Sequence, residues 1–202
     1  MSTVSSQGSA GSRSSVTTPA PAASLNAPPG VIILAKAIVA RESELQGQIT
    51  IGGGTIVHPS ARILAENGPI VIGDGNIIEE RVTIRNVFPV NEDGSSRTLY
   101  IGSKNLFETF SVTEGNIGDL NTISCKARVG KATTLRNGCV VGVSCAVDSA
   151  ETIPDNMFIY RNGENIERRT SDFNQTPPSI DDHLEFLQKQ LPNYHYILKT
   201  ST

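Results

Sequence analysis

The chain has 202 residues and a formal net charge of −3, and only 18% of its residues are charged. This balance excludes a protein that attracts nucleic acid or anionic membranes through a general positive field. Three cysteines, with no CxxC pair and no His/Cys cluster, argue against a disulfide framework and a structural zinc site. No apolar run is long enough for a transmembrane helix, so we expect no direct membrane insertion.

Residues 1–30 are rich in Ser, Ala, Pro and Gly and contain no acidic residue. Such a segment buries too little apolar surface to offset its ordering entropy, which predicts a disordered, low-complexity N-terminal extension. It lacks the apolar core of a secretory signal peptide. A transit peptide, also rich in Ser and poor in acid, is the alternative, although Arg13 is the segment's single basic residue.

Residues 31–160 repeat with a period of six. Large apolar residues recur at Ile33, Val39, Leu45, Ile51, Val57, Ile63, then Ile72, Ile78, Ile84, Ile101, Phe107, and again at Ile117, Ile123, Val129, Leu135, Val141, Val147, Ile153, Ile159. Neither a helix nor a long strand has this period, but a chain coiling around a triangular prism does. The pattern predicts an all-β solenoid, a parallel β-helix of about seven coils. Coils are expected to begin near residues 33, 51, 72, 101, 117, 135 and 153.

Two further positions of each hexad carry a pattern. The residue after the apolar one is often Gly, which we interpret as a corner that needs a positive φ. Four residues after the apolar one, the side chain is small or polar, and we expect it to point inward, as at Cys139 and Cys145. Asn76, Asn105 and Asn121 share this position in successive coils, which predicts a stack of hydrogen-bonded amides. Asp74 and Asp119 beside them are expected to be solvated corner residues rather than cation ligands.

Interruptions of the period predict where the solenoid is irregular. Ile84 and Ile101 are seventeen residues apart, which predicts an extruded loop at residues 86–98. Residues 66–69 are expected to form a small bulge, and the spacing from Thr113 to Ile117 indicates a local deletion.

Residues 161–202 are expected to form a polar connector and then an α-helix that packs on the β-helix. Ser179 and Asp182 form a variant capping box at its start, and Pro192 is expected to end it. The apolar stripe predicted to contact the prism is Ile180, Leu184, Leu187 and Leu191. Tyr194, Ile197 and Leu198 are expected to add a further docked turn.

The chain offers few candidates for catalysis. His58 is the one histidine in the repeat region, and it is either a general base or a solvated or capping side chain. His183 and His195 lie in the C-terminal part, so a three-histidine zinc site is not expected. Cys125 has no base placed beside it. We therefore predict no catalytic, cofactor-binding or metal-binding residue and no cofactor.

Three segments carry a more specific resemblance: residues 31–63, GPIVIGDGNIIEE at 68–80 and LPNYHYILKT at 191–200. Together with the order of repeats, loop and helix, they resemble the dynactin subunit 6 family of hexapeptide-repeat proteins, whose fold is related to the γ-class carbonic anhydrases. The resemblance implies a left-handed β-helix without enzymatic activity. Where those anhydrases tend to have Arg-x-Asp, this chain has Gln46-Gly47-Gln48. The Ser-rich N-terminal extension departs from animal members.

The resemblance also implies a function. Such a subunit belongs to the pointed-end complex of dynactin, beside dynactin subunit 5, an actin-related protein and a larger zinc-containing subunit. The complex supports dynein-driven transport and cargo selection in the cytoplasm, on the cytoskeleton. We expect a scaffold whose partners bind a prism face and the 86–98 loop. The first alternative is a homotrimeric hexapeptide-repeat enzyme, an acyltransferase or γ-carbonic-anhydrase-like protein, that uses His58. The second is a mitochondrial assembly factor related to the γ-class anhydrases but without metal.

Overall fold

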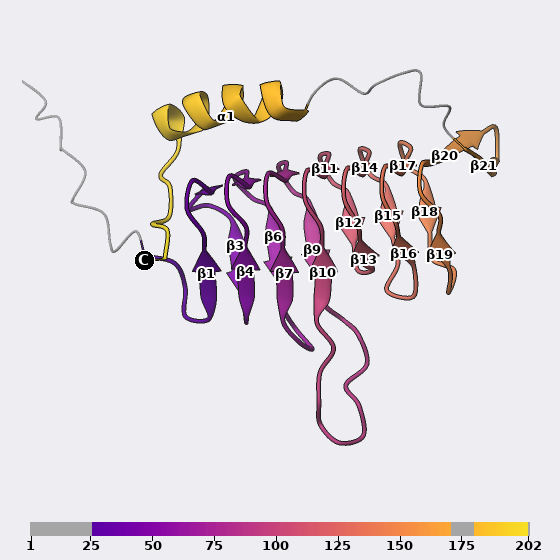
Figure 1. The fold of residues 1–202 in the computed structure, drawn as a ribbon, viewed down its shortest axis with the longest axis horizontal. Coiled ribbons are helices and arrows are strands. Elements are labelled where there is room, and N and C mark those ends of the chain that lie inside the picture. Colours follow the sequence, from indigo (N-terminus) through magenta and orange to yellow (C-terminus); the bar gives the residue numbers. More distant parts are fainter. Residues whose placement is uncertain (1–25, 171–179, 202) are drawn as a thin grey trace, which may run out of the picture.

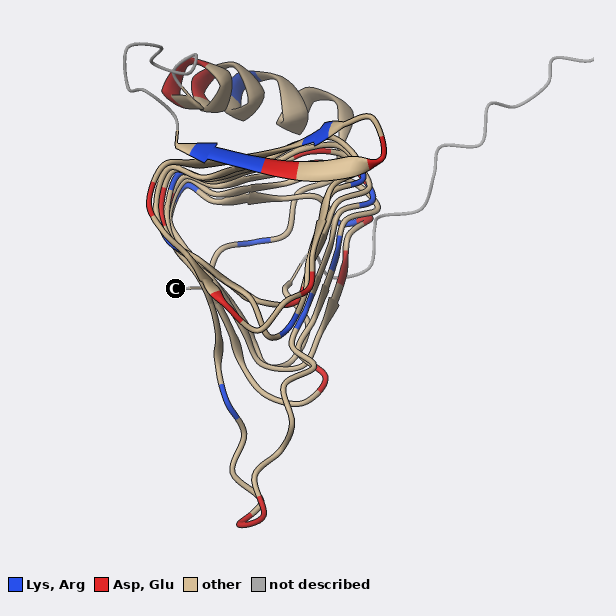
Figure 2. Ribbon diagram, turned by 90° about the vertical axis from the view of Figure 1, so that its right-hand side faces the viewer, with Lys and Arg blue, Asp and Glu red and all other residues tan. Residues whose placement is uncertain are grey.

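The computed structural model describes residues 26–170 and 180–201, which form a β-solenoid of triangular cross-section with one helix along it (Figures 1 and 2). Each of its three walls is a sheet, parallel except for one strand. The first wall contains β1 (Val31–Ile33), β4 (Ile49–Ile51), β7 (Ile70–Ile72), β10 (Leu99–Ile101), β13 (Asn116–Ile117), β16 (Thr134–Leu135) and β19 (Thr152–Ile153).

The other two walls follow the same order along the axis. The second wall contains β2 (Ile38–Val39), β5 (Ile56–Val57), β8 (Ile77–Ile78), β11 (Leu106–Phe107), β14 (Thr122–Ile123), β17 (Val140–Val141), β20 (Met157–Asn162) and β21 (Asn165–Thr170). The third wall contains β3 (Glu44–Gln46), β6 (Arg62–Leu64), β9 (Thr83–Arg85), β12 (Val112–Thr113), β15 (Arg128–Val129) and β18 (Ala146–Val147).

The solenoid of about seven coils expected from the sequence is confirmed. The seven strands of the first wall end at the predicted coil starts, and their apolar residues pair in register, for example Ile33 with Ile51 and Ile51 with Ile72. Those side chains are buried inside the prism and form one core along the axis. Thr113 takes the apolar position in β12 and is buried there, next to the predicted deletion.

The predicted reason for the glycines at the second hexad position is wrong. Gly52 does not have a positive φ; a Cβ on it would lie 2.2 Å from the carbonyl oxygen of Gly73 in the next coil. Glycine is required because stacked coils approach too closely for a side chain. The positive φ falls two residues later in the corner, and there the chain often uses other residues, such as Lys104 (φ 56°) and Leu120 (φ 59°).

The predicted asparagine stack is confirmed. The Asn121 side-chain amide donates to Oδ1 of Asn105 at 3.1 Å, and the Asn105 amide donates to Oδ1 of Asn76 at 3.0 Å. The backbone N–H groups of Asn105 and Asn121 donate to the same two oxygens, and the N–H of Cys139 donates to Oδ1 of Asn121. The ladder is fully buried, so its amides satisfy the backbone of one inner corner without water.

Residues 161–170 belong to a β-hairpin, and the polar connector expected there is therefore wrong. β20 and β21 form an antiparallel hairpin whose turn is Gly163-Glu164, with Gly163 at φ 61°. Asn162-Gly163 is a strong hairpin signal, but β21 is largely exposed and therefore lacks the alternating apolar pattern of a buried strand. The hairpin extends the second wall beyond the last coil.

Helix α1 (Ile180–Tyr194) lies on the second wall, as Figure 1 shows. Its predicted stripe is confirmed: Leu184, Leu187 and Leu191 are buried against Ile56 and Ile77. Pro192 does not end the helix, which continues to Tyr194. Proline removes its own hydrogen bond to residue 188, but its φ suits a helix and the N–H of His195 still reaches the Leu191 carbonyl at 3.0 Å.

Three expectations fall partly or wholly on residues that the structure does not describe. The N-terminal extension, apart from residues 26–30, lies outside the described residues. So does Ser179, and with it the capping box that pairs it with Asp182. The part of the expected connector at 171–179 also lies outside them.

Candidate interaction surface

The three walls differ in what their outer faces offer a partner. The second wall is occupied over its first strands, because α1 covers the outward side chains of β2, β5, β8 and β11. Figure 2 shows the helix lying on this wall and the 86–98 loop projecting from the opposite corner of the prism. The two remaining walls meet at that corner.

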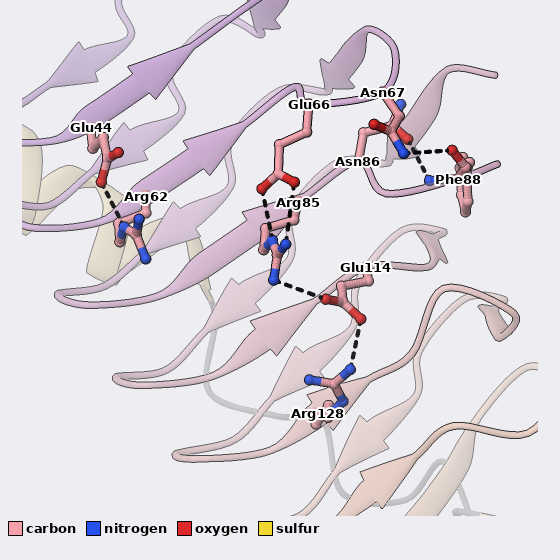
Figure 3. A network of polar contacts seen from close by, with 9 residues as sticks. All are labelled: Glu44, Arg62, Glu66, Asn67, Arg85, Asn86, Phe88, Glu114 and Arg128. Atoms are coloured by element: carbon pink, nitrogen blue, oxygen red, sulfur yellow. Dashed lines mark hydrogen bonds and ion pairs between the residues drawn. The ribbon is translucent and has the colours of Figure 1, made fainter. Parts of the chain in front are cut away.

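The third wall carries a row of charges that are paired with one another (Figure 3). Arg62 pairs with Glu44 at 2.6 Å, and Arg85 pairs with Glu66 at 3.0 Å. Each arginine pKa is raised above its usual value by the hydrogen bond to its carboxylate. The charges of neighbouring coils therefore compensate one another within the chain.

Glu114 joins two coils of the same row. Its side chain is 8% exposed and lies between Arg85, at 3.5 Å, and Arg128, at 2.7 Å. Arg128 also reaches Asp148 at 3.1 Å. A carboxylate this buried is stable only with such partners, so these arginines are already used within the chain.

The first wall has no charged residue in any of its seven strands. Its outward side chains are aliphatic, aromatic, amide or hydroxyl groups: Ile32, Thr50, Val71, Tyr100, Asn116, Thr134 and Thr152. Tyr100 is 58% exposed and Ile32 is 48% exposed. Two open depressions lie on this wall, one around Tyr100, Asn116 and Thr134 and one around Ile32, Thr50 and Val71. Charged residues at the corner of the wall, Arg136 and Asp155, also line the first depression.

The 86–98 loop leaves the corner between the first and third walls and is anchored at its base. Asn86 is fully buried and donates to the carbonyls of Pro69 at 2.8 Å and Arg97 at 2.7 Å. Phe88 is 2% exposed and belongs to the core, while the Arg97 guanidinium lies 4.5 Å over its ring. Asn67 donates to the Phe88 carbonyl at 3.1 Å. The loop is therefore held at both of its ends.

The tip of the loop is ordered by its own hydrogen bonds. Asn91 and Ser95 bond through both backbone and side-chain groups, and Asp93 accepts from the Ser95 N–H at 2.8 Å. Hydrogen bonds from Ser95 hold the pKa of the Asp93 carboxyl below its usual value. Val90 beside this acidic tip is 51% exposed. The tip thus presents one apolar side chain and two carboxylates, of Glu92 and Asp93.

His58 is buried and not solvated, which rules out one of the two expected non-catalytic alternatives, a solvated or a capping side chain. It is 8% exposed, and Nδ1 lies 2.9 Å from Oε1 of Glu80. Burial alone would raise the pKa of Glu80, but hydrogen bonding to His58 and to backbone holds it below its usual value. Neither of the two depressions on the first wall includes His58.

The cysteines show no arrangement for nucleophilic chemistry. Cys139 and Cys145 are buried at the small inward position, as predicted, and burial raises the pKa of the Cys139 thiol. Cys125 is half-buried and accepts from the Thr109 hydroxyl at 3.6 Å. Asp74 and Asp119 accept backbone N–H groups of Gly53 and Ser103 in the preceding coil.

The part of the chain that the structure describes has no group of three His, Cys, Asp or Glu side chains able to hold a metal ion. Within the same residues, no helix is long and apolar enough to cross a membrane.

The sequence predicted the 86–98 loop but not the residues that anchor its base. Phe88, an aromatic residue within a polar insertion, and Asn86 beside it were the available signals. The sequence also did not predict the role of Glu114, because a lone Glu within the repeats does not reveal two arginines on neighbouring coils.

Fold and surfaces together define a hexapeptide-repeat β-solenoid with one wall partly covered by a helix, a charge-paired wall and an open wall whose strands carry no charge. No protein-family model matches the chain. It is 45% identical to dynactin subunit 6 of Nematostella vectensis over 185 residues, covering 89% of this chain and 98% of the relative. The chain belongs to the dynactin subunit 6 family.

Two more distant similarities concern enzymes. The chain is 28% identical over 147 residues to a carbonic anhydrase of Methanosarcina thermophila, covering 65% of this chain and 59% of that protein. A solved hexapeptide transferase family protein from Anaplasma phagocytophilum superposes with a TM-score of 0.60 at 12% identity, covering 81% of this chain and 88% of the other. The latter similarity extends to the fold alone.

Proposed function

We propose that this protein is a non-catalytic structural subunit of the dynactin pointed-end complex. In this role it supports dynein-driven transport along microtubules and cargo selection, and it acts in the cytoplasm on the cytoskeleton. Its proposed partners are dynactin subunit 5, the pointed-end actin-related protein and the larger pointed-end subunit. The observation that carries the proposal is the 45% identity to a dynactin subunit 6 over nearly the whole of that relative.

The site geometry supports a scaffold over an enzyme. His58 is the candidate base, but its ring is 8% exposed, its Nδ1 is hydrogen-bonded to Glu80, and neither depression on the first wall includes it. A general base must come within hydrogen-bond reach of the proton that it removes. The solenoid itself is rigid, because every coil is bonded to its neighbours, and rigidity lowers the entropy lost on binding.

We place the main partner contact, with another dynactin subunit, on the first wall and the 86–98 loop. The helix α1 covers the second wall from β2 to β11, and the charges of the third wall are paired with one another. The strands of the first wall combine exposed apolar groups with no charge, and uncharged surface is typical of interface centres. The loop extends from the edge of this wall and adds Val90 and the acidic tip.

Two variants test this placement by copurification of the tagged protein with dynactin subunits from cytosol. Tyr100→Glu puts a charge on the first wall, and a Gly-Ser replacement of residues 89–95 removes the loop tip but keeps Asn86 and Phe88. Both are expected to lower recovery of the partners at least ~10-fold. Tyr100→Glu does so because a charge buried without a partner costs several kcal/mol, and the loop replacement does so because Val90 and the acidic tip are lost. The control is Phe186→Glu on the outer side of α1, where Phe186 is 59% exposed. Full recovery with both variants would remove the proposed contact.

A further inference from the structure

The two irregular segments expected from the sequence lie beside each other in the structure. Residues 66–69 lie in the turn from β6 to β7, and the 86–98 loop connects β9 to β10 in the next coil. We call residues 66–69 the bulge. The N–H of Leu99, where the loop rejoins the first wall, donates to the Pro69 carbonyl of the bulge at 2.9 Å. The bulge of one coil is therefore bonded to the base of the loop in the next.

Asn86 lies at the centre of this contact and uses both its amide hydrogens and its oxygen. The amide nitrogen donates to the Pro69 carbonyl at 2.8 Å and to the carbonyl of Arg97, on the returning arm of the loop, at 2.7 Å. Oδ1 accepts from the N–H of Phe88, on the outgoing arm, at 3.2 Å. One side chain thus joins the bulge to both arms. Asn86 is fully buried, so it acts on a partner only through the loop that it holds.

Gly68 of the bulge is required for the same contact. A Cβ on Gly68 would lie 2.5 Å from the carbonyl oxygen of Arg97 and 3.0 Å from Cβ of Ser96. The returning arm comes this close only because position 68 has no side chain. Asn67, the preceding residue, donates to the carbonyl of Phe88 on the outgoing arm at 3.1 Å. Two neighbouring residues of the bulge thus contact opposite arms of the loop.

The tip of the loop is bonded differently from its base. The hydrogen bonds that the structure shows for residues 89–95 join residues of the tip to one another, as between Asn91 and Ser95. The direction in which the tip projects is therefore set at the base. A tip already held in one direction loses little conformational freedom when a partner binds it, and this raises the affinity.

We propose that Asn86 and the bulge form a lock that fixes the direction of the 86–98 loop, and that Asn86 is a positioning residue for partner binding at the loop tip. The inference rests on the proposed function, in which the tip contacts another dynactin subunit. It goes further because it assigns part of the affinity to buried residues that the partner does not touch. Loss of the lock leaves Val90 and the acidic tip in the chain but lets them move.

Trypsin cleavage after Arg97, followed by mass spectrometry, measures the lock in the free protein. Cleavage of a folded chain follows the population of its locally open form. Asn86→Ala removes three hydrogen bonds, so this cleavage should be at least ~10-fold faster than in the parent protein. An unchanged rate would overturn the proposal.

Asn105→Ala is the matched control for Asn86→Ala. The Asn105 amide is also fully buried and its side chain also takes part in three hydrogen bonds, but it lies between β10 and β11, in the corner between the first and second walls. Its loss should leave cleavage after Arg97 within ~2-fold of the parent rate, because distant sites act independently. Equally fast cleavage in both variants would show a general loss of stability and overturn the lock.

Copurification of the partners from cytosol tests the positioning role. Asn86→Ala should lower their recovery at least ~10-fold, as replacement of the tip does, whereas Asn105→Ala should retain it. If replacement of the tip lowers recovery and Asn86→Ala does not, the positioning role is wrong. If replacement of the tip leaves recovery complete, the proposed contact fails and the positioning role with it, while the cleavage rate still decides whether the lock exists.

Gly68→Ala decides the matter if Asn86→Ala does not fold. This variant keeps Asn86, but its Cβ pushes the returning arm away, so cleavage after Arg97 should again be at least ~10-fold faster than in the parent protein. Gly53→Ala is the control, because its Cβ would lie 3.2 Å from the Ala35 carbonyl oxygen, away from the loop. Equal cleavage rates in these two variants would overturn the lock.

Discussion

The side-chain amide of Asn105 donates to Oδ1 of Asn76, one coil away, at 3.0 Å, inside a corner from which water is excluded. Oδ1 of Asn105 in turn accepts from both the backbone and the side chain of Asn121. The side chain of Asn105 therefore joins three coils, and the inner ladder is a determinant of stability as well as of register.

Replacing Asn105 by alanine tests the ladder. The change takes the acceptor away from the buried backbone and side-chain donors of Asn121 and removes one of the two donors to Oδ1 of Asn76, which should lower the free energy of unfolding by about 2–4 kcal/mol. Denaturant unfolding measures it, with Asn137→Ala as the control. Asn137 makes the same kind of contact, to the N–H of Asp119 at 2.8 Å, but on an exposed corner, so its loss should cost less than about 1 kcal/mol. Equal losses would contradict a special role for the buried ladder.

Gly52→Ala tests the requirement for close stacking of the coils. Its Cβ would meet the Gly73 carbonyl at 2.2 Å, so adjacent backbones must separate, and we expect a loss of about 3 kcal/mol or more in thermal or denaturant unfolding. Gly53→Ala is the matched neighbour, because its Cβ would lie 3.2 Å from the Ala35 carbonyl and a small shift relieves the contact. If both variants were equally stable, close approach would not explain this glycine.

Leu187→Ala tests how strongly α1 is held to the second wall. Leu187 is buried among the outward residues of that wall, and truncating such a side chain lowers the free energy of unfolding by about 2–4 kcal/mol. Phe186→Ala on the exposed side of the helix should change it by less than about 0.5 kcal/mol. The difference is read from denaturant unfolding curves, and a neutral Leu187→Ala would mean that the helix is not docked as described.

The ion pair of Glu151 and Arg168 predicts a pH dependence of stability. Hydrogen bonds from Arg168, and then from Ser149, lower the pKa of Glu151 to about 2 from the usual 4.5. Because the folded-state value is depressed, the pair's contribution is complete above pH 4.5 and declines as pH falls toward 2. Between these values Glu151→Gln should lose less stability on acidification than the parent protein, measured by thermal unfolding. Identical pH profiles would contradict the pairing of β21 with the coil beneath it.

Periodicity predicted the part of the fold that is set by local repetition. Each coil buries the same hexad positions, so a run such as Ile117, Ile123 and Val129 determines the direction of every side chain before any long-range contact is known. The asparagine ladder followed in the same way, because equal positions in successive hexads stack.

The six-residue period could not predict contacts made by residues outside the repeat. Ser201 bonds to Ile33 across 168 positions of sequence, and no spacing rule connects them. The hairpin of residues 157–170 was hidden because an exposed strand needs no apolar alternation, although Asn162-Gly163 marked its turn. The charge-free character of the first wall emerged only when seven short strands were placed side by side.

The most direct test of the central claim is affinity purification of the tagged full-length protein from cytosol, followed by mass spectrometry and a native mass of the purified assembly. We expect recovery of a second hexapeptide-repeat chain together with an actin-related protein and dynein–dynactin components. Recovery of the protein alone as a homotrimer that carries zinc or coenzyme A would contradict it. His58→Ala would then be the variant to assay for activity.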